Sequence, residues 1–338
     1  MNTLRETEGG EFDVVIVGGG IAGLAAARTT ANQGLKTAVI ESSGALGREI
    51  GRARSMFVDL ERHSHGSATL AAWMNGLRDK KGWFPDGGAD TCCSEVVFDD
   101  LLEEAGVDVW FQVLPAHLLT VDGAVNGIRI ASKNGYTLLR TPLVIDASAE
   151  GKIARAWYEE KPAQAQGGAI HVLYNHVDRA VSCPEELTLQ LPHFGEVTVR
   201  CRPTFWPGEW RVSFYTTSAL SRHEYALLVK SALEPLHQQI AGLGEAVLSH
   251  VAGDAWTAPG FALQANGASP AIAATCTDGK REHVIQHGAL YNEQVLKGLV
   301  LAGGWLEPFP YDIRDEERTI IQLAQLGEAA AQLAETIS

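Results

Sequence analysis

The chain has 338 residues, of which 46% are hydrophobic and 20% are charged. A globular chain of this length is expected to form about two domains and to bury a core without metals or disulfides. Its formal net charge of −14 argues against nucleic acid and anionic membranes as partners, because both require a basic protein surface.

The first half of the chain alternates predicted strands and helices. Residues 12–17 read as a buried strand, residues 24–34 as a helix closed by Gly34, and residues 35–41 as a second strand. A strand, turn, helix and strand within about 30 residues is a βαβ-type unit. The other elements predicted in this half are a Gly- and Arg-rich loop entering a helix at 42–56, an amphipathic helix at 94–105, short strands at 107–113, 124–132 and 136–140, and a buried strand at 143–147.

The second half has a different pattern of predicted elements, in which short strands are separated by glycine and proline. The strands predicted there are residues 168–174, 186–191, 196–203 and 209–216, followed by a helical stretch at 221–251, a buried strand at 298–302 and a long helix at 315–337 that Asp312 is expected to cap. We therefore predict an α/β fold with a discontinuous Rossmann-like domain, residues 11–166 and 287–338. Its parallel sheet is accompanied by a small crossover sheet, and residues 167–286 form an inserted, mostly antiparallel α+β substrate domain.

The motif that carries most information follows the first strand. Residues 18–23 read Gly-Gly-Gly-Ile-Ala-Gly, which gives G-x-G-x-x-G between a predicted strand and a predicted helix. In this motif the first glycine permits a tight turn, the second lets the backbone approach a pyrophosphate, and the third lets the helix pack closely on the strand. Glu41 ends the second strand, where a carboxylate can accept hydrogen bonds from both ribose hydroxyls. This placement favours FAD or NAD over NADP.

Four segments, in the correct order, resemble the FAD-dependent oxidoreductases with a glutathione reductase-like fold. They are residues 13–27 with 39–42, residues 94–112 with 125–130, LVIDASAEGKIA at 143–154, and residues 297–305 followed by 312–314 and 325–334. The resemblance implies FAD as the cofactor and implies the residues that bind it. They are Gly18, Gly20, Ile21, Ala22 and Gly23 at the diphosphate, Glu41 at the ribose, and Ser42, Arg48, Ala147, Ser148, Gly303, Gly304 and Arg314 as further cofactor contacts.

The chain departs from the family pattern at two of these places. Ser148 and Ala149 stand where the family has Thr-Gly, and Gly303-Gly304-Trp305 stands where it has AGR or AGD. A contact that the family makes with a side chain after the last strand must then come from the backbone or from elsewhere.

Candidates for the reaction centre rest on weaker signals. Arg54, Trp305 and Arg314 are the candidate catalytic residues, although packing or surface ion pairs explain the same residues. Trp305, with Phe309 and Tyr311, is equally compatible with a wall of the substrate pocket. The vicinal cysteines at 92–93 read better as ordinary thiols than as a redox pair, and the H-x-H of residues 63–65 better as a rim pair than as a metal or flavin ligand.

The electron donor is not specified by the sequence. A second G-x-G-x-x-G and a C-x-x-x-x-C pair are both missing from the sequence, which argues against a pyridine nucleotide–disulfide reductase. Electrons would then come from the substrate, from NAD(P)H that docks transiently, or from a partner reductase. The five cysteines, which match no zinc pattern, and the polar N-terminus predict a cytoplasmic protein without a metal site, a signal peptide or a membrane span.

Together these features predict an FAD-dependent oxidoreductase that acts on a small or medium organic substrate by hydride transfer to flavin, as an oxidase or a dehydrogenase. A flavin-dependent monooxygenase of a biosynthetic tailoring pathway is an alternative with the same architecture. A non-catalytic binding protein on the same fold is an alternative of another class. A plain NAD-linked dehydrogenase would leave residues 143–154 and 297–305 unexplained.

Overall fold

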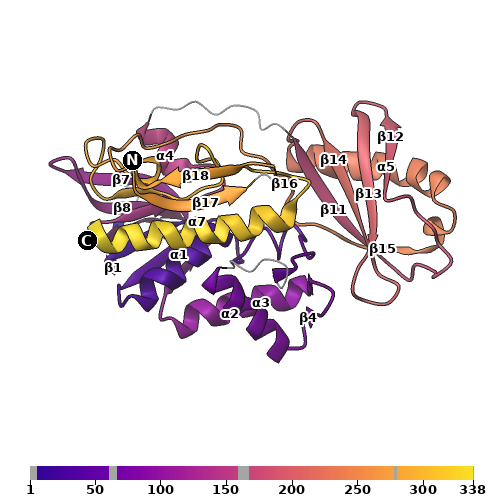
Figure 1. Cartoon of the computed structure of the whole chain (residues 1–338), viewed down its shortest axis with the longest axis horizontal. Helices are drawn as coiled ribbons and strands as arrows, with labels where there is room; N and C mark the ends of the chain where they lie inside the picture. Colours follow the sequence, from indigo (N-terminus) through magenta and orange to yellow (C-terminus); the bar gives the residue numbers. More distant parts are fainter. Residues whose placement is uncertain (1–5, 61–66, 159–166, 278–279, 338) are drawn as a thin grey trace.

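The computed structural model describes residues 6–60, 67–158, 167–277 and 280–337 (Figure 1). Its centre is a five-stranded parallel sheet in the order β19 (Leu299–Leu301), β10 (Val144–Asp146), β2 (Val14–Val17), β3 (Thr37–Glu41) and β6 (Asp108–Phe111). Every residue of β2, β3, β10 and β19 is buried, as expected for parallel strands covered on both faces.

Helices and a second sheet cover this parallel sheet. The helices are α1 (Ile21–Asn32), α2 (Ala68–Asp79), α3 (Thr91–Glu104), α4 (Lys152–Trp157), α6 (His287–Leu290) and α7 (Glu316–Ile337). Figure 1 shows α7 running along α1, and the two helices pack against each other. The second sheet has the order β1 (Glu6–Glu11), β9 (Gly135–Arg140), β8 (Ala124–Ser132) and β7 (Leu114–Val121).

Strand β1 is not predicted by the sequence because it has no apolar face. Its residues are exposed or half-buried, and it pairs in parallel with β9. Ion pairs from Glu6 to Arg129 at 2.9 Å and from Glu8 to Arg140 at 3.0 Å accompany the pairing. Backbone hydrogen bonds and charge, rather than hydrophobic burial, therefore hold this edge.

The inserted sheet projects away from the rest of the molecule (Figure 1). Its order is β12 (Glu186–Leu191), β13 (Gly195–Pro203), β14 (Trp210–Thr216), β11 (Gly168–Asn175) and β15 (Val247–Val251), all antiparallel, with β16 (Trp256–Thr257) also paired to β11. Helix α5 (Arg222–Gln239) covers one face, and Ser221 with Glu224 forms its capping box. The α/β class, the parallel sheet and the separate, mostly antiparallel sheet are confirmed.

Three local predictions are wrong. The stretch 221–251 is not helical throughout, because α5 ends at Gln239, η2 (Leu243–Glu245) follows, and β15 pairs with the edge of β11. Asp315, not Asp312, caps α7: its Oδ1 accepts from the Arg318 amide at 3.1 Å, whereas Asp312 accepts from the Arg314 amide before the helix begins. Residues 42–56 form successive turns instead of a regular helix.

Two hairpins complete the chain, β4 (Trp83–Phe84) with β5 (Gly88–Ala89) and β17 (Ile272–Thr277) with β18 (Glu282–Gln286). The second hairpin falls within residues 167–286 but packs along α7, where Cys276 and Ile285 are buried and Gln322 donates to the Thr277 carbonyl at 2.8 Å. We therefore propose that it belongs with the nucleotide-binding half. No helix in the described residues is long and apolar enough to cross a membrane.

The contact between α1 and α7 depends on Gly327. A Cβ at this position would collide with the carbonyl oxygen of Ala22. We expect Gly327→Ala to lower the free energy of unfolding by about 1 kcal/mol or more, because the overpacking cost exceeds the better helix propensity of alanine. Urea unfolding measures this change. Gln332→Ala, at an exposed position of the same helix, should shift the free energy by no more than about 0.5 kcal/mol, and equal midpoints for both variants would contradict the packing argument.

Candidate active site

The glycine turn after β2 has no room for side chains. Gly18 has a φ of +99°, and a Cβ there would lie 2.7 Å from Cα of Ser148 on the neighbouring strand end. A Cβ at Gly23 would collide with the carbonyl oxygen of Gly18. The glycine motif therefore lies between a strand and a helix, which is the context that diphosphate binding requires. The amides at the start of α1 lie at the carboxyl edge of the parallel sheet.

A cavity of about 330 Å³, the nucleotide cavity, opens beside this turn. Seven predicted cofactor residues line it: Gly18, Gly20, Glu41, Ser42, Arg48, Ala147 and Ser148. They come from the carboxyl ends of β2, β3 and β10 and from the loop after β3, where ligands bind in open α/β sheets.

The other predicted cofactor residues lie outside the cavity lining. Ile21, Ala22 and Gly23 are buried in the first turn of α1. Gly303 packs against the indole of Trp305, and Gly304 packs against Tyr311. Arg314 lines a different cavity, described below.

Sequence reasoning does not identify eight further residues of the lining. They are Ser43, Glu49, Arg52, Ala149, Glu150, Lys152, Asp254 and Thr257. Ala149, Glu150 and Lys152 lie inside the recognised segment 143–154, so that motif contained the signal for them. Asp254 and Thr257 come from the inserted half, and no local pattern marks them.

The carboxylate of Glu41 is buried and already ordered. Its Oε2 accepts from the Gly19 amide at 2.7 Å, and its Oε1 accepts from the Ser43 amide at 2.5 Å. The Ser42 hydroxyl also donates to Oε1, at 3.3 Å. A carboxylate has about four acceptor positions, so about one remains open for a ribose hydroxyl, and a second opens when the Ser42 hydroxyl turns away. The contact of Glu41 with a ribose stays a prediction.

Glu49 lies where a phosphate is expected. Its Oε2 accepts from the Ile21 amide at 2.9 Å, at the N-terminus of α1, and its side chain is buried against Gly20. A carboxylate on a helix N-terminus is stabilised by the same partial charge that attracts a phosphate. The glycine cradle and Glu41 fit an FAD diphosphate and ribose, with the condition that the flexible Glu49 side chain turns away from the amide.

Two arginines of the loop after β3 join the nucleotide cavity to the inserted half. Arg52 Nε lies 2.6 Å from Asp254 Oδ2, and Arg48 Nη2 donates to the carbonyl of Ala255 at 2.9 Å. Burial opposes ionisation of Asp254, but the hydrogen bond from Arg52 and the charge of Arg48 outweigh it and lower its pKa. Arg48 therefore lines the predicted cofactor cavity and also binds the inserted half that forms one side of it.

A second space, the inter-domain cavity of about 540 Å³, adjoins the nucleotide cavity. The two share Arg48, Glu150, Asp254 and Thr257. The inter-domain cavity continues past Ile170 of β11 towards the inserted sheet. A ligand with two linked parts, such as a dinucleotide, can therefore extend from one cavity into the other.

The candidate catalytic residues are dispersed. Arg54 Nη1 donates to Thr91 Oγ1 at 2.6 Å beside a separate cavity of about 220 Å³. Trp305 is buried, donates to the Ser148 carbonyl at 2.8 Å and stacks on Phe261, so it supports the strand ends by packing.

Of the cysteines and histidines singled out by the sequence, the structure describes only the cysteines. All five cysteines are free thiols, and burial followed by the charge of Asp90 raises the pKa of Cys93. The described residues contain no group of three or more His, Cys, Asp or Glu arranged to bind a metal. His63 and His65 lie outside the described residues.

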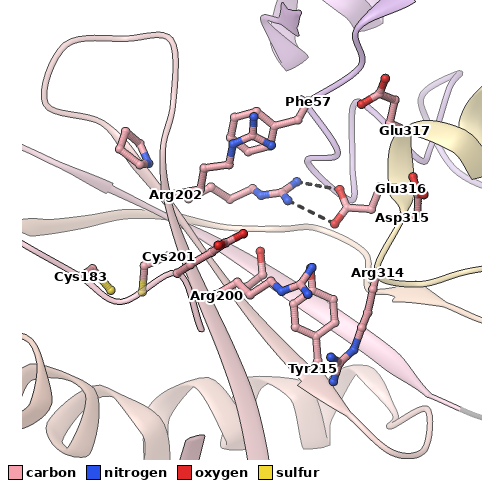
Figure 2. Close-up of a pocket in the computed structure, with 14 residues that line it drawn as sticks. Phe57, Cys183, Arg200, Cys201, Arg202, Tyr215, Arg314, Asp315, Glu316 and Glu317 are labelled. Atoms are coloured by element: carbon pink, nitrogen blue, oxygen red, sulfur yellow. Dashed lines mark hydrogen bonds and ion pairs between the residues drawn. The ribbon is translucent and has the colours of Figure 1, made fainter. Parts of the chain in front are cut away.

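The inserted sheet meets α7 through a buried polar network. Arg211 of β14 donates to both carboxylate oxygens of Glu316, at 2.7 and 3.2 Å, a pair that Figure 2 marks with dashed lines. His171 lies between them and Ser213, with Nδ1 2.8 Å from the Ser213 hydroxyl and Nε2 3.3 Å from Glu316. Burial opposes ionisation of Glu316, but the charge of Arg211 outweighs it and lowers its pKa.

This network predicts a specific dependence of stability on pH. Burial, only partly offset by Glu316, lowers the pKa of His171 to about 3. Since the unfolded imidazole binds a proton near its ordinary pKa of about 6.5, stability present above that pH is lost as pH falls towards 3. His171→Asn removes the group that binds this proton. Between about pH 7 and about pH 5 we therefore expect the variant to lose about 2 kcal/mol less unfolding free energy than the parent protein, as measured by urea unfolding at each pH. Parallel pH profiles for the two proteins would contradict the assignment.

Comparisons with known proteins agree with this geometry. Residues 13–159 match the model of the family described as FAD dependent oxidoreductase. A search of the curated proteins finds none that matches the sequence.

Solved structures share the fold at low sequence identity. A geranylgeranyl bacteriochlorophyll reductase-like protein from Thermoplasma acidophilum has a TM-score of 0.58 and 18% identity, over 98% of this chain and 79% of that one. Glycine oxidase from Bacillus cereus has a TM-score of 0.55 and 14% identity, over 97% and 96% of the two chains. The p-nitrophenol 4-monooxygenase of Pseudomonas putida has a TM-score of 0.52 and 15% identity, over 99% and 80%.

The matched segment contains the glycine turn, Glu41 and the Ala147–Ser148 strand end, which are the parts of the fold that form the nucleotide cavity. Over residues 13–159 the chain therefore matches the FAD-dependent oxidoreductases, and this match indicates an enzyme that binds FAD.

Proposed function

We propose that FAD extends from the nucleotide cavity into the inter-domain cavity and that the protein uses it to oxidise a small or medium organic substrate held against the inserted sheet. One observation carries this proposal: the glycine turn and Glu41 line a cavity that adjoins a second one reaching the inserted sheet. When bound, FAD supplies the hydride acceptor, and the protein supplies position and electrostatics.

The roles of the chain's own residues follow from their places. The amides after Gly18 and the N-terminus of α1 bind the diphosphate. Glu41 accepts hydrogen bonds from the ribose, and Ser148, two residues after β10 ends, lies beside the turn. Arg48 and Arg52 keep the inserted half closed over the cavity through Ala255 and Asp254, which limits the access of water.

We propose that electrons come from the substrate itself, or from NAD(P)H or a partner reductase that docks transiently. The sequence has one G-x-G-x-x-G motif, which FAD uses. Five free thiols are compatible with a reducing compartment, and the proposed setting is the cytoplasm.

A flavin-dependent monooxygenase is the second candidate. It is supported by the p-nitrophenol monooxygenase and by an aromatic hydroxylase of angucycline biosynthesis, which match with TM-scores of 0.52 and 0.56. Glycine oxidase matches at 0.55, so the fold is compatible with both reactions.

The reaction of the reduced cofactor with oxygen separates the candidates. The protein is reconstituted with FAD, reduced with dithionite and exposed to air with and without a panel of organic acids, amines and phenols. Release of hydrogen peroxide indicates an oxidase, slow reoxidation in air indicates a dehydrogenase, and a hydroxylated product indicates a monooxygenase. A protein that stays colourless after reconstitution contradicts the flavoenzyme and supports a non-catalytic binding protein.

Glu41 is expected to contribute directly to FAD affinity. Glu41→Ala removes a charged acceptor for the ribose hydroxyls, and we expect the Kd for FAD to rise about 10- to 100-fold in a flavin fluorescence titration. Glu103→Ala, which removes an exposed carboxylate from α3, is the matched control. Unchanged affinity in a folded Glu41→Ala protein would remove Glu41 from the cofactor site.

Glu49 is expected to have the opposite effect. It occupies the Ile21 amide, so its carboxylate competes with the diphosphate. We expect Glu49→Gln to lower the Kd for FAD about 10-fold, because the repulsion between two anions is lost while the size of the side chain is kept. If Glu49→Gln binds FAD more weakly than the parent protein, Glu49 helps to hold the cofactor and the competition model is wrong.

A further inference from the structure

A separate cavity of about 490 Å³ lies on the face of the inserted sheet opposite α5, between β13, β14 and the start of α7 (Figure 2). Four arginines line it: Arg200, Arg202, Arg211 and Arg314. We call it the arginine cavity. Its volume is within the range of small-molecule sites, about 300–1,000 Å³.

Three of the four arginines have carboxylate partners. Arg211 pairs with Glu316 at 2.7 Å, and both side chains are buried. Arg200 pairs with Glu186 at 2.8 Å, and Arg314 lies 3.7 Å from the same carboxylate. These guanidinium groups are therefore largely neutralised within the protein.

Arg202 is different. Figure 2 shows its guanidinium over the Phe57 ring, and the distance to the ring centre is 3.7 Å. No carboxylate of the described residues forms an ion pair with it. Burial and the charge of Arg211 lower its pKa by more than the nearby carboxylates, Glu317 first, raise it. The positive charge of Arg202 therefore has no carboxylate partner in the described part of the chain, and an additional anion would stabilise it.

The arginine cavity is connected to the cofactor site by a short stretch of chain. Arg48 lines the nucleotide cavity, and Phe57 of the same segment lines the arginine cavity. Arg211 also donates to the Arg54 carbonyl at 3.0 Å, which fixes this segment against the sheet. A ligand in the arginine cavity would therefore contact the segment that also borders the cofactor.

We propose that the arginine cavity is a binding site, separate from the two cavities given to FAD, for a small organic acid with a single carboxylate, whose oxygens accept hydrogen bonds from Arg202. The rings of Phe57 and Tyr215 provide an apolar surface for the rest of the molecule. Glu185 and Glu317 line the same cavity and disfavour a second negative charge, which excludes polyanions such as nucleotides.

The test is calorimetric titration of the FAD-reconstituted protein with three acids, benzoate, hexanoate and phenylalanine, each against its own amide. We expect at least one acid to bind about 10-fold more tightly than its amide, and Arg202→Met to abolish this preference while amide binding is kept. Arg129→Met, which removes an arginine of the crossover sheet paired with Glu6, should leave the preference unchanged.

The outcomes distinguish this inference from the proposed function. If the protein binds FAD but no acid binds more tightly than its amide, or Arg202→Met keeps the full preference, the acid site is overturned and the flavoenzyme stands. The titration is repeated before FAD is added. An acid preference that depends on Arg202 in a protein unable to bind FAD would support the cavity and contradict the proposed function. If Arg202→Met does not fold, Arg202→Lys keeps the charge but not the paired donors, and it should weaken acid binding selectively.

Discussion

The close approach of three backbone segments at Gly18 is the constraint on which the cofactor site depends. The turn after β2 passes within van der Waals distance of Ser148 at the end of β10, and α1 begins so close to the turn that Gly23 has no room for a Cβ. Because side chains are excluded there, the N-terminal amides of α1 face the cavity directly. The parallel order β10-β2-β3 then places Glu41 and Ser148 on either side of these amides.

The same constraint explains why Glu49 lies where it does. A helix N-terminus carries unpaired amides and a partial positive charge, so it attracts the nearest anion. In this chain that anion is a carboxylate from the loop after β3. One amide cannot serve a carboxylate and a phosphate fully at the same time, so the affinity for FAD reflects a competition between them. A glycine turn alone is therefore an incomplete description of a phosphate site, because the neighbouring loop decides what competes for it.

How much of the site the sequence predicts depends on whether its residues lie in recognisable motifs. Gly18, Glu41 and Ser148 lie in motifs whose spacing is set by one βαβ-type unit and one further strand, and the structure brings all three to one cavity. Asp254 reaches the same cavity only through the fold of the inserted half, and its pairing with Arg52 spans 202 residues. No local pattern can report such a contact.

Two other differences have local physical causes. Residues 247–251 alternate between exposed and half-buried positions, so β15 has no apolar signature and is defined by pairing with β11. Gly303 and Gly304 precede Trp305 and pack against the rings of Trp305 and Tyr311. A tryptophan at the family's arginine position thus changes what the neighbouring glycines do, since they now accommodate aromatic rings.

The segment from Arg48 to Phe57 links both proposed sites, and its attachments determine how it can respond to FAD. It is held at Arg48 by the carbonyl of Ala255, at Arg52 by Asp254, and at the Arg54 carbonyl by Arg211. The backbone is also held on both sides of Glu49, since the Gly47 amide donates to the Gly19 carbonyl at 2.8 Å and the Arg52 carbonyl accepts from the Asp254 amide at 3.3 Å. Entry of a diphosphate then requires a side-chain rotation instead of a rearrangement of the loop. The cost is about one hydrogen bond to a charged group, roughly 1.5–3 kcal/mol. Phe57 and the arginine cavity can then keep their positions while the cofactor binds.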